Sequence, residues 1–96
     1  MTLHTLNASP ASAAFADCLR LLTAGDALLL MGDGVYAALA GCSHRAELDT
    51  SGAMLYVLRD DAAAAGVLDR VDGVTVVDID GFVTLSEQYA RQLAWF

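Results

Sequence analysis

The sequence predicts a small Rossmann-like α/β domain, with a mainly parallel sheet of about four strands and helices on both faces. Short apolar runs of strand length alternate with segments whose apolar residues repeat at helical spacing, which is the pattern of successive βαβ units. The run Ala27–Met31 is apolar throughout and is followed at once by Gly32-Asp33-Gly34. This is expected of a strand that is buried on both faces and turns into a helix.

The 96 residues are expected to form one domain, 1–96, because a chain of this length builds a single core. The composition is 56% hydrophobic and only 18% charged, whereas soluble domains contain about 45–50% apolar residues. A chain this small cannot bury so much apolar surface by itself. We therefore expect an obligate oligomer.

The first strand and helix are expected in the amino-terminal quarter. Thr2–Leu6 alternates and is rich in β-forming residues, and the turn cluster Asn7–Pro10 after it favours the opening of a helix. That helix is expected over Ala11–Thr23, ending before Gly25 as helices commonly do. Its buried stripe holds Phe15, Cys18, Leu19 and Leu22.

The central strand is expected to continue into a short helix that carries Val35, Tyr36 and Leu39 at helical spacing. Residues 41–52 show no period and are rich in polar and turn residues. They indicate a surface loop with room for one helical turn.

Two further strands and helices are expected in the second half of the chain. Ala53–Leu58 is a short apolar run followed by the alanine-rich helix opening Ala62–Ala65, and Val74–Ile79 is rich in β-branched residues. The last helix is expected to end in the exposed aromatic pair Trp95-Phe96, which suggests docking. Its apolar residues recur at i, i+3, i+7 and i+11: Phe82, Leu85, Tyr89 and Leu93.

The net charge of the chain limits the kinds of molecule that it can bind. Ten Asp and two Glu against five Arg and no Lys give a formal charge of −7, and an acidic surface repels phosphates. We therefore expect no direct binding of nucleic acid by this chain. No apolar run is long enough to span a membrane, no signal sequence is evident, and two cysteines form no regular framework, so a reduced cytoplasmic setting is expected.

The Gly32-Asp33-Gly34 turn stands where doubly wound folds bind ligands, past the carboxyl end of a strand and at a helix start. A nucleotide site is disfavoured, because Asp33 would place a carboxylate where a phosphate belongs, the third glycine of the fingerprint is missing, and the chain has no Lys for a P-loop. We expect Asp33 to cap the helix, and Asp80 to do the same before the last helix. No cofactor is expected.

Two cysteines and one histidine are the remaining candidates for chemistry. Cys18 lies on an apolar helical stripe, where cysteine usually behaves as a small inert hydrophobe; a persulfide role would require its thiol to be accessible and ionised. Cys42 is either a spare surface thiol or one activated by His44 and Arg45. Because Cys42-x-His44 offers only two ligands, no metal site is expected. His4 is expected to be a packed or edge histidine rather than a general base.

Several motifs, taken in order, resemble those of the TusB/DsrH family. They are Leu3-His-Thr-Leu-Asn-x-Ser-Pro10, Cys18-Leu-Arg, Gly25-Asp-x-Leu-Leu-Leu, Asp33-Gly-Val-Tyr-Ala-Ala-Leu, Leu55-Tyr-Val-Leu, Asp80-Gly-Phe-Val-x-Leu and Gln92-Leu-Ala-Trp95. Each motif is loose by itself, but their order and spacing extend from end to end. The chain departs from the family at Ala64-Ala65-Gly66, where Ala-Arg-Gly is frequent, and at Tyr89-Ala90, where His-Pro is familiar.

The resemblance implies a subunit of a cytoplasmic sulfur relay complex. In this family TusB, TusC and TusD, or their counterparts DsrH, DsrF and DsrE, assemble as a dimer of heterotrimers. The TusBCD complex relays persulfide sulfur from a cysteine desulfurase system, through the small carrier TusE, to 2-thiolation of the tRNA wobble uridine. The DsrEFH complex serves sulfur oxidation, and this is the alternative that the resemblance leaves open.

The resemblance also implies roles for individual residues. The main sulfur-carrying cysteine belongs to the TusD/DsrE subunit, and its place is taken here by Leu58, which implies a component that is not itself catalytic. Cys18 falls where DsrH-type members carry a cysteine of their own and is the candidate persulfide acceptor. The aromatic residues expected at the subunit interface are Tyr36, Tyr89, Trp95 and Phe96.

Overall fold

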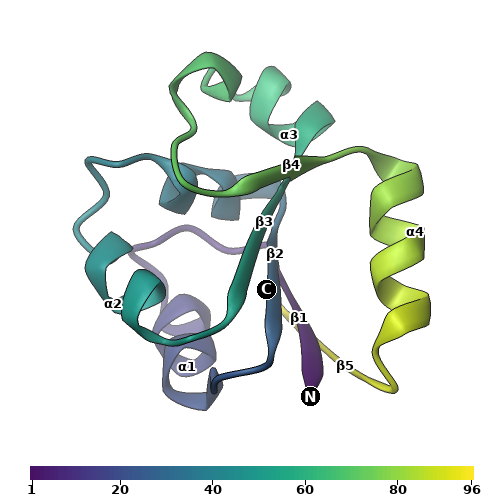
Figure 1. Ribbon diagram of the computed structural model, residues 1–96. Helices are drawn as coiled ribbons and strands as arrows, with labels where there is room; N and C mark the ends of the chain where they lie inside the picture. The colour runs from purple at the N-terminus through teal and green to yellow at the C-terminus, as the bar shows by residue number, and fades with distance from the viewer.

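The computed structural model describes all 96 residues as a five-stranded parallel sheet in the order β4-β3-β2-β1-β5 (Figure 1). The strands are β1 Thr2–Leu6, β2 Ala27–Leu30, β3 Met54–Leu58, β4 Thr75–Val77 and β5 Arg91–Trp95. The α-helices are α1 Ala13–Leu21, α2 Arg45–Thr50, α3 Arg59–Ala64 and α4 Ile79–Gln88, with 3-10 helices η1 Gly32–Ala38 and η2 Leu68–Arg70. The predicted Rossmann-like class is confirmed, with one more strand than expected.

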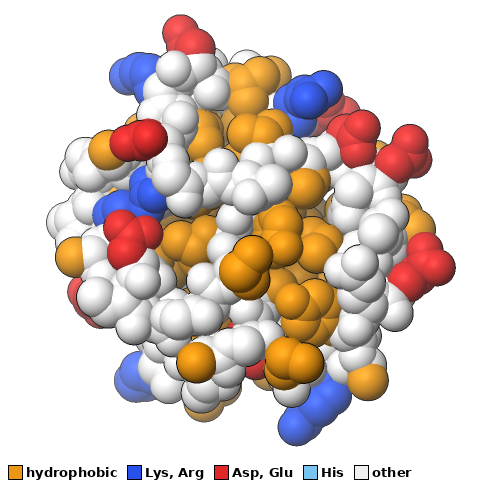
Figure 2. All heavy atoms as spheres, in the orientation of Figure 1, with side chains coloured by type: hydrophobic (Ala, Val, Ile, Leu, Met, Phe, Trp, Pro, Cys, Tyr) orange, Lys and Arg blue, Asp and Glu red, His pale blue; other side chains and the backbone are white.

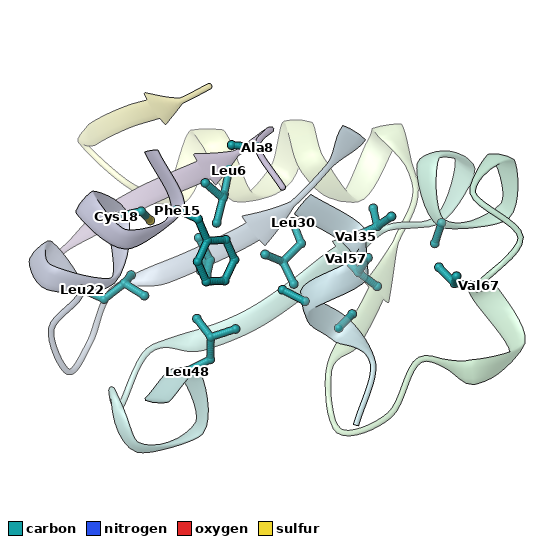
Figure 3. Packing of buried hydrophobic residues seen from close by; sticks show 14 residues of the cluster. Leu6, Ala8, Phe15, Cys18, Leu22, Leu30, Val35, Leu48, Val57 and Val67 are labelled. Carbon is teal, nitrogen blue, oxygen red and sulfur yellow. The ribbon is translucent and has the colours of Figure 1, made fainter. Parts of the chain in front are cut away.

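Alternation along the strands divides the core into two layers. Leu6 and Leu30 face the larger cluster, which Phe15 of α1 and residues of η1, α2 and α3 complete (Figure 3). Leu3 and Leu29 point to the opposite face, which α4 crosses alone (Figure 1). The central strand β2 is buried on both faces along its whole length, as its unbroken apolar sequence predicts.

The fifth strand corrects the expected last helix. α4 ends at Gln88 because Tyr89 adopts extended backbone angles, φ −116° and ψ 124°, and β5 then pairs in parallel with β1 from Thr2↔Arg91 to Leu6↔Trp95. Leu93 lies in β5, so its helical spacing from Leu85 and Tyr89 does not reflect a continued helix. This pairing provides hydrogen-bond partners for backbone groups along the edge of β1. The spacing of apolar residues in the carboxyl-terminal segment carries no information about β1, so it could not predict the pairing.

Other boundaries shift by a few residues. The expected loop over residues 41–52 contains the one-turn-and-a-half helix α2. Helix α3 begins at Arg59, directly after β3, earlier than the alanine-rich segment suggested. Strand β4 is shorter than the predicted Val74–Ile79, because Asp78 leaves the sheet and its carboxylate accepts a hydrogen bond from the N–H of Gly81 at 2.9 Å. Asp78, rather than the expected Asp80, therefore caps α4.

Candidate functional site

The turn after β2 lies at the carboxyl edge of the sheet, but the N–H groups of both its glycines are already engaged. The N–H of Gly32 donates to Oδ2 of Asp61 at 2.7 Å, and the N–H of Gly34 donates to the carbonyl of Met31 at 2.9 Å. Asp33 is exposed and makes no capping hydrogen bond, so the expectation that it caps this helix is wrong. A carboxylate from α3 holds the place that a phosphate would need, which opposes a nucleotide site.

Close packing explains the two glycines of this turn. Gly32 has a positive φ of 53° and lies against the side-chain amide of Asn7, and a methyl group at Gly34 would collide with the carbonyl oxygen of Leu6. Both contacts press the turn onto the chain that leaves β1. The glycines therefore serve the packing of two strand ends rather than the approach of a ligand.

Cys18 is fully buried in the larger core cluster, which also holds Phe15 of α1 and Leu22, the residue that follows this helix (Figure 3). Burial raises the pKa of its thiol to about 12. Sulfur transfer requires a thiolate that another molecule can reach. In this conformation Cys18 is a protonated core residue, as its helical stripe predicts.

Leu58 is the last residue of β3, is 5% exposed and immediately precedes α3. It is the residue at which the family resemblance leads us to expect the carrier cysteine of the related TusD/DsrE subunit. The carboxyl end of this strand therefore presents a packed leucine instead of a nucleophile.

Cys42 is half-buried, and the side chains of the two basic residues beside it in the sequence contact other groups. His44 lies against the ring of Phe15, with ring centroids 5.2 Å apart, and its Nδ1 is 3.4 Å from Oε1 of Glu47. Arg45 is buried and donates to the carbonyl oxygens of Ala38 and Asp72 and to the carboxylate of Asp49. Arg45 is thus a structural clamp, and of the two alternatives for Cys42 these contacts favour the spare thiol over one activated by His44 and Arg45.

Cys42 lines a cavity of about 540 Å³, together with Pro10, Tyr36, Leu39, Ala40, Gly41 and Arg70. Its walls are mainly apolar, and Arg70 forms no ion pair. Volumes of this order are common for ligand pockets.

No group of three or more His, Cys, Asp or Glu side chains lies close enough together to hold a metal ion.

A buried polar network joins three distant segments of the chain, and sequence reasoning missed it. His4 is 1% exposed, its Nε2 lies 3.1 Å from Oδ2 of Asp26, and Nε1 of Trp95 donates to its Nδ1 at 3.1 Å. Asp26 also accepts hydrogen bonds from the backbone N–H groups of Thr2 and Thr23 and from the Thr23 hydroxyl. Burial opposes ionisation of Asp26, but these hydrogen bonds outweigh it and lower its pKa.

The expectation that His4 is a packed histidine is confirmed, whereas its polar partners could not be foreseen. Asp26 and Trp95 are 22 and 91 residues away in the sequence. Three of the motifs that carry the family resemblance, at His4, Asp26 and Trp95, meet at this point. Their common role is to attach the strand β5 and the start of β2 to β1.

The four aromatic residues expected at an interface differ in their exposure. Phe96 is 86% exposed and Tyr36 is 41% exposed. Tyr89 packs against the cluster below α4, and Trp95 packs against the larger cluster. Only Tyr36 and Phe96 therefore offer much apolar surface to another molecule.

Apolar side chains also gather elsewhere on the surface. Figure 2 shows them between β4 and α4, over the middle of the sheet. The large hydrophobic residues with more than two-fifths of their surface exposed are Met1, Leu21, Tyr36, Met54, Ile79, Val83, Leu93 and Phe96. None of the helices is both long and apolar enough to cross a membrane.

Comparisons with known proteins agree with the fold described above. The family described as DsrH like protein matches residues 8–92. The chain is 44% identical to Protein TusB of Pectobacterium parmentieri and 45% identical to Protein TusB of Klebsiella pneumoniae strain 342, in each case over 97% of this chain and 99% of the relative. It is 39% identical, with the same coverage, to Protein TusB of Escherichia coli O1:K1 / APEC. The solution NMR structure of protein Tm0979 from Thermotoga maritima has the same fold, with a TM-score of 0.69 and 22% identity over 92% of this chain and 93% of that chain.

Proposed function

Because the chain belongs to the DsrH-like family, we propose that it is a structural subunit of a cytoplasmic sulfur relay complex that supports 2-thiolation of the tRNA wobble uridine. Its partners in this proposal are TusC-like and TusD-like subunits in a dimer of heterotrimers, and it meets a TusE-like carrier only through them. It binds no nucleic acid itself. The relatives named Protein TusB support this assignment over the DsrEFH-like alternative in sulfur oxidation.

The observation that carries the structural role is the state of its thiols. Leu58, which ends β3, stands where the resemblance to the family places the carrier cysteine of the related subunit, and Cys18 is buried with a pKa raised to about 12. A persulfide acceptor must expose a thiolate to its donor. Neither position offers one, and the side chains of His44 and Arg45, which could activate the accessible Cys42, bond to other groups. In this proposal the sulfur is therefore carried by a partner subunit, and this chain contributes surface to the complex.

The exposed apolar side chains support assembly. Tyr36 on η1 and Phe96 after β5 are exposed aromatic residues, and aromatic side chains are enriched in interface cores. An acidic chain of charge −7 that exposes large apolar residues is better suited to a protein partner than to a nucleic acid. We place Tyr36 and Phe96 at the subunit interface on these grounds.

Intact-mass spectrometry tests the proposal directly. The chain is purified alone and assembled with its two partner subunits, and each sample is incubated with a cysteine desulfurase and cysteine. We expect sulfur atoms to be added to a partner subunit and none to this chain. Cys18→Ala and Cys42→Ser are expected to leave tRNA thiolation nearly unchanged.

One added sulfur on this chain that disappears in Cys18→Ala would overturn the structural role and support the persulfide acceptor instead. Failure to form any complex with the partner subunits would remove the proposed assembly. The folded state of each variant is checked by circular dichroism, so that loss of structure is not mistaken for loss of function.

A further inference from the structure

We propose that His4 is a proton-controlled latch on the carboxyl end of β5: neutral His4 holds Trp95 in place, and protonated His4 releases it. This inference stands on the buried network of His4, Asp26 and Trp95 and is independent of the sulfur relay. It concerns the strand that lies at the edge of the sheet beside β1.

The hydrogen bonds determine where the imidazole proton lies. The indole N–H of Trp95 can only donate, so the Nδ1 atom of His4, 3.1 Å away, must present a lone pair. The ring planes are 19° apart, as expected when the N–H points along that lone pair. The single proton of neutral His4 is consequently on Nε2, where it is donated to Oδ2 of Asp26 at 3.1 Å.

Protonation of His4 reverses one of these contacts and preserves the other. A second proton on Nδ1 would face the indole N–H, so two donors would oppose each other and the hydrogen bond to Trp95 would be lost. The contact with the Asp26 carboxylate would become an ion pair. The change therefore acts on Trp95 and leaves β1 attached to the start of β2.

Release of the indole would free a half-buried side chain packed against the larger cluster, whereas the carbonyl of Trp95 would still accept the hydrogen bond from the N–H of Asn7 at 2.8 Å. β5 pairs only with β1, its residues Arg91 to Ala94 are exposed, and Trp95 is half-buried at its end. Phe96 follows and is 86% exposed. A local opening at such an edge costs much less than global unfolding.

The charged and titratable groups around His4 are few. Asp26 contacts it and favours the protonated ring, whereas Trp95 favours the neutral one. β2 carries no titratable residue, α1 presents Cys18 from its buried face, and Arg91 of β5 is exposed and pairs with Thr2 at the other end of the strand. The competition between Asp26 and Trp95 for the imidazole thus determines whether the Trp95 indole keeps its hydrogen bond.

The experiment uses the folded full chain, in which Trp95 is the only tryptophan and His4 is one of two histidines. Tryptophan fluorescence is followed from pH 8 to pH 5, the range in which imidazoles titrate, and ¹⁵N NMR reports the protonated nitrogen of His4 in the same samples. We expect Trp95 emission to change with the titration of His4. His44→Gln, which removes the other histidine, should retain this change, and His4→Gln should abolish it.

The decisive measurement uses the thermodynamic linkage between protonation of His4 and its hydrogen bond to Trp95. If protonation releases Trp95, removal of the indole donor must make protonation easier. Trp95→Phe is expected to move the NMR titration of His4 to higher pH by about one unit, a tenfold increase in proton affinity. An unchanged or lower midpoint in Trp95→Phe, or a neutral wild-type ring with its proton on Nδ1, would overturn the proposal.

Discussion

The two cysteines, though only 24 positions apart, have different surroundings. Cys18 is fully buried and its thiol is kept protonated, whereas Cys42 is half-buried at the wall of a cavity. Thiol reactivity depends on both the thiolate fraction and access. Burial therefore separates an inert thiol from an accessible one in a way that the sequence only partly indicated.

Alkylation of the native chain at neutral pH should modify Cys42 and spare Cys18, because a reagent can reach only the thiol of Cys42. Peptide mass mapping after brief treatment with iodoacetamide measures the two sites separately. Cys42→Ser should give almost no modification, and denaturant should make Cys18 reactive. Equal rates at both thiols in the folded chain would contradict the burial of Cys18.

Asp26 should make stability sensitive to acid. Its pKa is lowered in the folded chain from an ordinary value of 3.8, so its contribution is present above that value and is lost as the pH falls through the lower, folded-state pKa. Asp26→Asn should reduce the free energy of unfolding at pH 7 by about 2 kcal/mol, because buried hydrogen bonds to a carboxylate are lost.

Urea unfolding at pH 7 and at pH 3 measures this effect. The difference between the wild type and Asp26→Asn should shrink at the lower pH. Asp33→Asn is a suitable control, because Asp33 is exposed and makes no capping hydrogen bond. A difference that stays constant over this pH range would argue against an ionised, hydrogen-bonded Asp26.

At the scale of elements, close approach between strand ends shapes the carboxyl edge of the sheet. Gly34 of η1 lies against the carbonyl of Leu6 at the end of β1, and Asp61 of α3 accepts a hydrogen bond from Gly32. At the turn that sequence motifs placed at a ligand site, the N–H of Gly32 is thereby already bonded to a carboxylate of this chain. These contacts hold the end of β1, the turn after β2 and α3 together.

Gly34→Ala should destabilise the fold by about 2 kcal/mol or more, because the added methyl group would collide with backbone rather than with a movable side chain. Thermal or urea unfolding measures the loss. Gly41→Ala is the matched control, since no atom lies within 4 Å of its added methyl group and its φ is not positive. Equal stability of the two variants would show that η1 can move away from β1.

At the scale of the whole molecule, two layers of core leave a considerable apolar surface. α4 alone covers one face of a five-stranded sheet, and residues such as Met54, Val83 and Phe96 remain exposed. The hydrophobic composition of 56% already pointed to this excess. The isolated chain should therefore self-associate when its partners are absent.

Phe96→Asp should weaken assembly with the partner subunits at least tenfold, since loss of an aromatic anchor commonly costs more than 1.4 kcal/mol of binding, which corresponds to about a factor of ten. Size-exclusion chromatography with light scattering measures the assembly. Phe96 is the better target than Trp95, because Trp95→Ala would also remove the hydrogen bond to His4. Met1→Ser serves as a matched control for general loss of apolar surface, and equal assembly of both variants would place the interface elsewhere.

By itself, the sequence determined the fold class, the central strand, the order of the first four strands along the chain, the burial of Cys18 and the family. The family was indicated by the resemblance of motifs along the whole chain, and the other properties follow from local composition and periodicity, in which each residue is read with its near neighbours. Only the tertiary structure decided that Arg91–Trp95 is a strand, that Asp61 accepts a hydrogen bond from the N–H of Gly32 in the turn after β2, that Arg45 is a buried clamp and that His4, Asp26 and Trp95 form one network. The physical reason is that a backbone edge or a buried polar atom must be satisfied by some partner, and its position along the chain does not identify that partner.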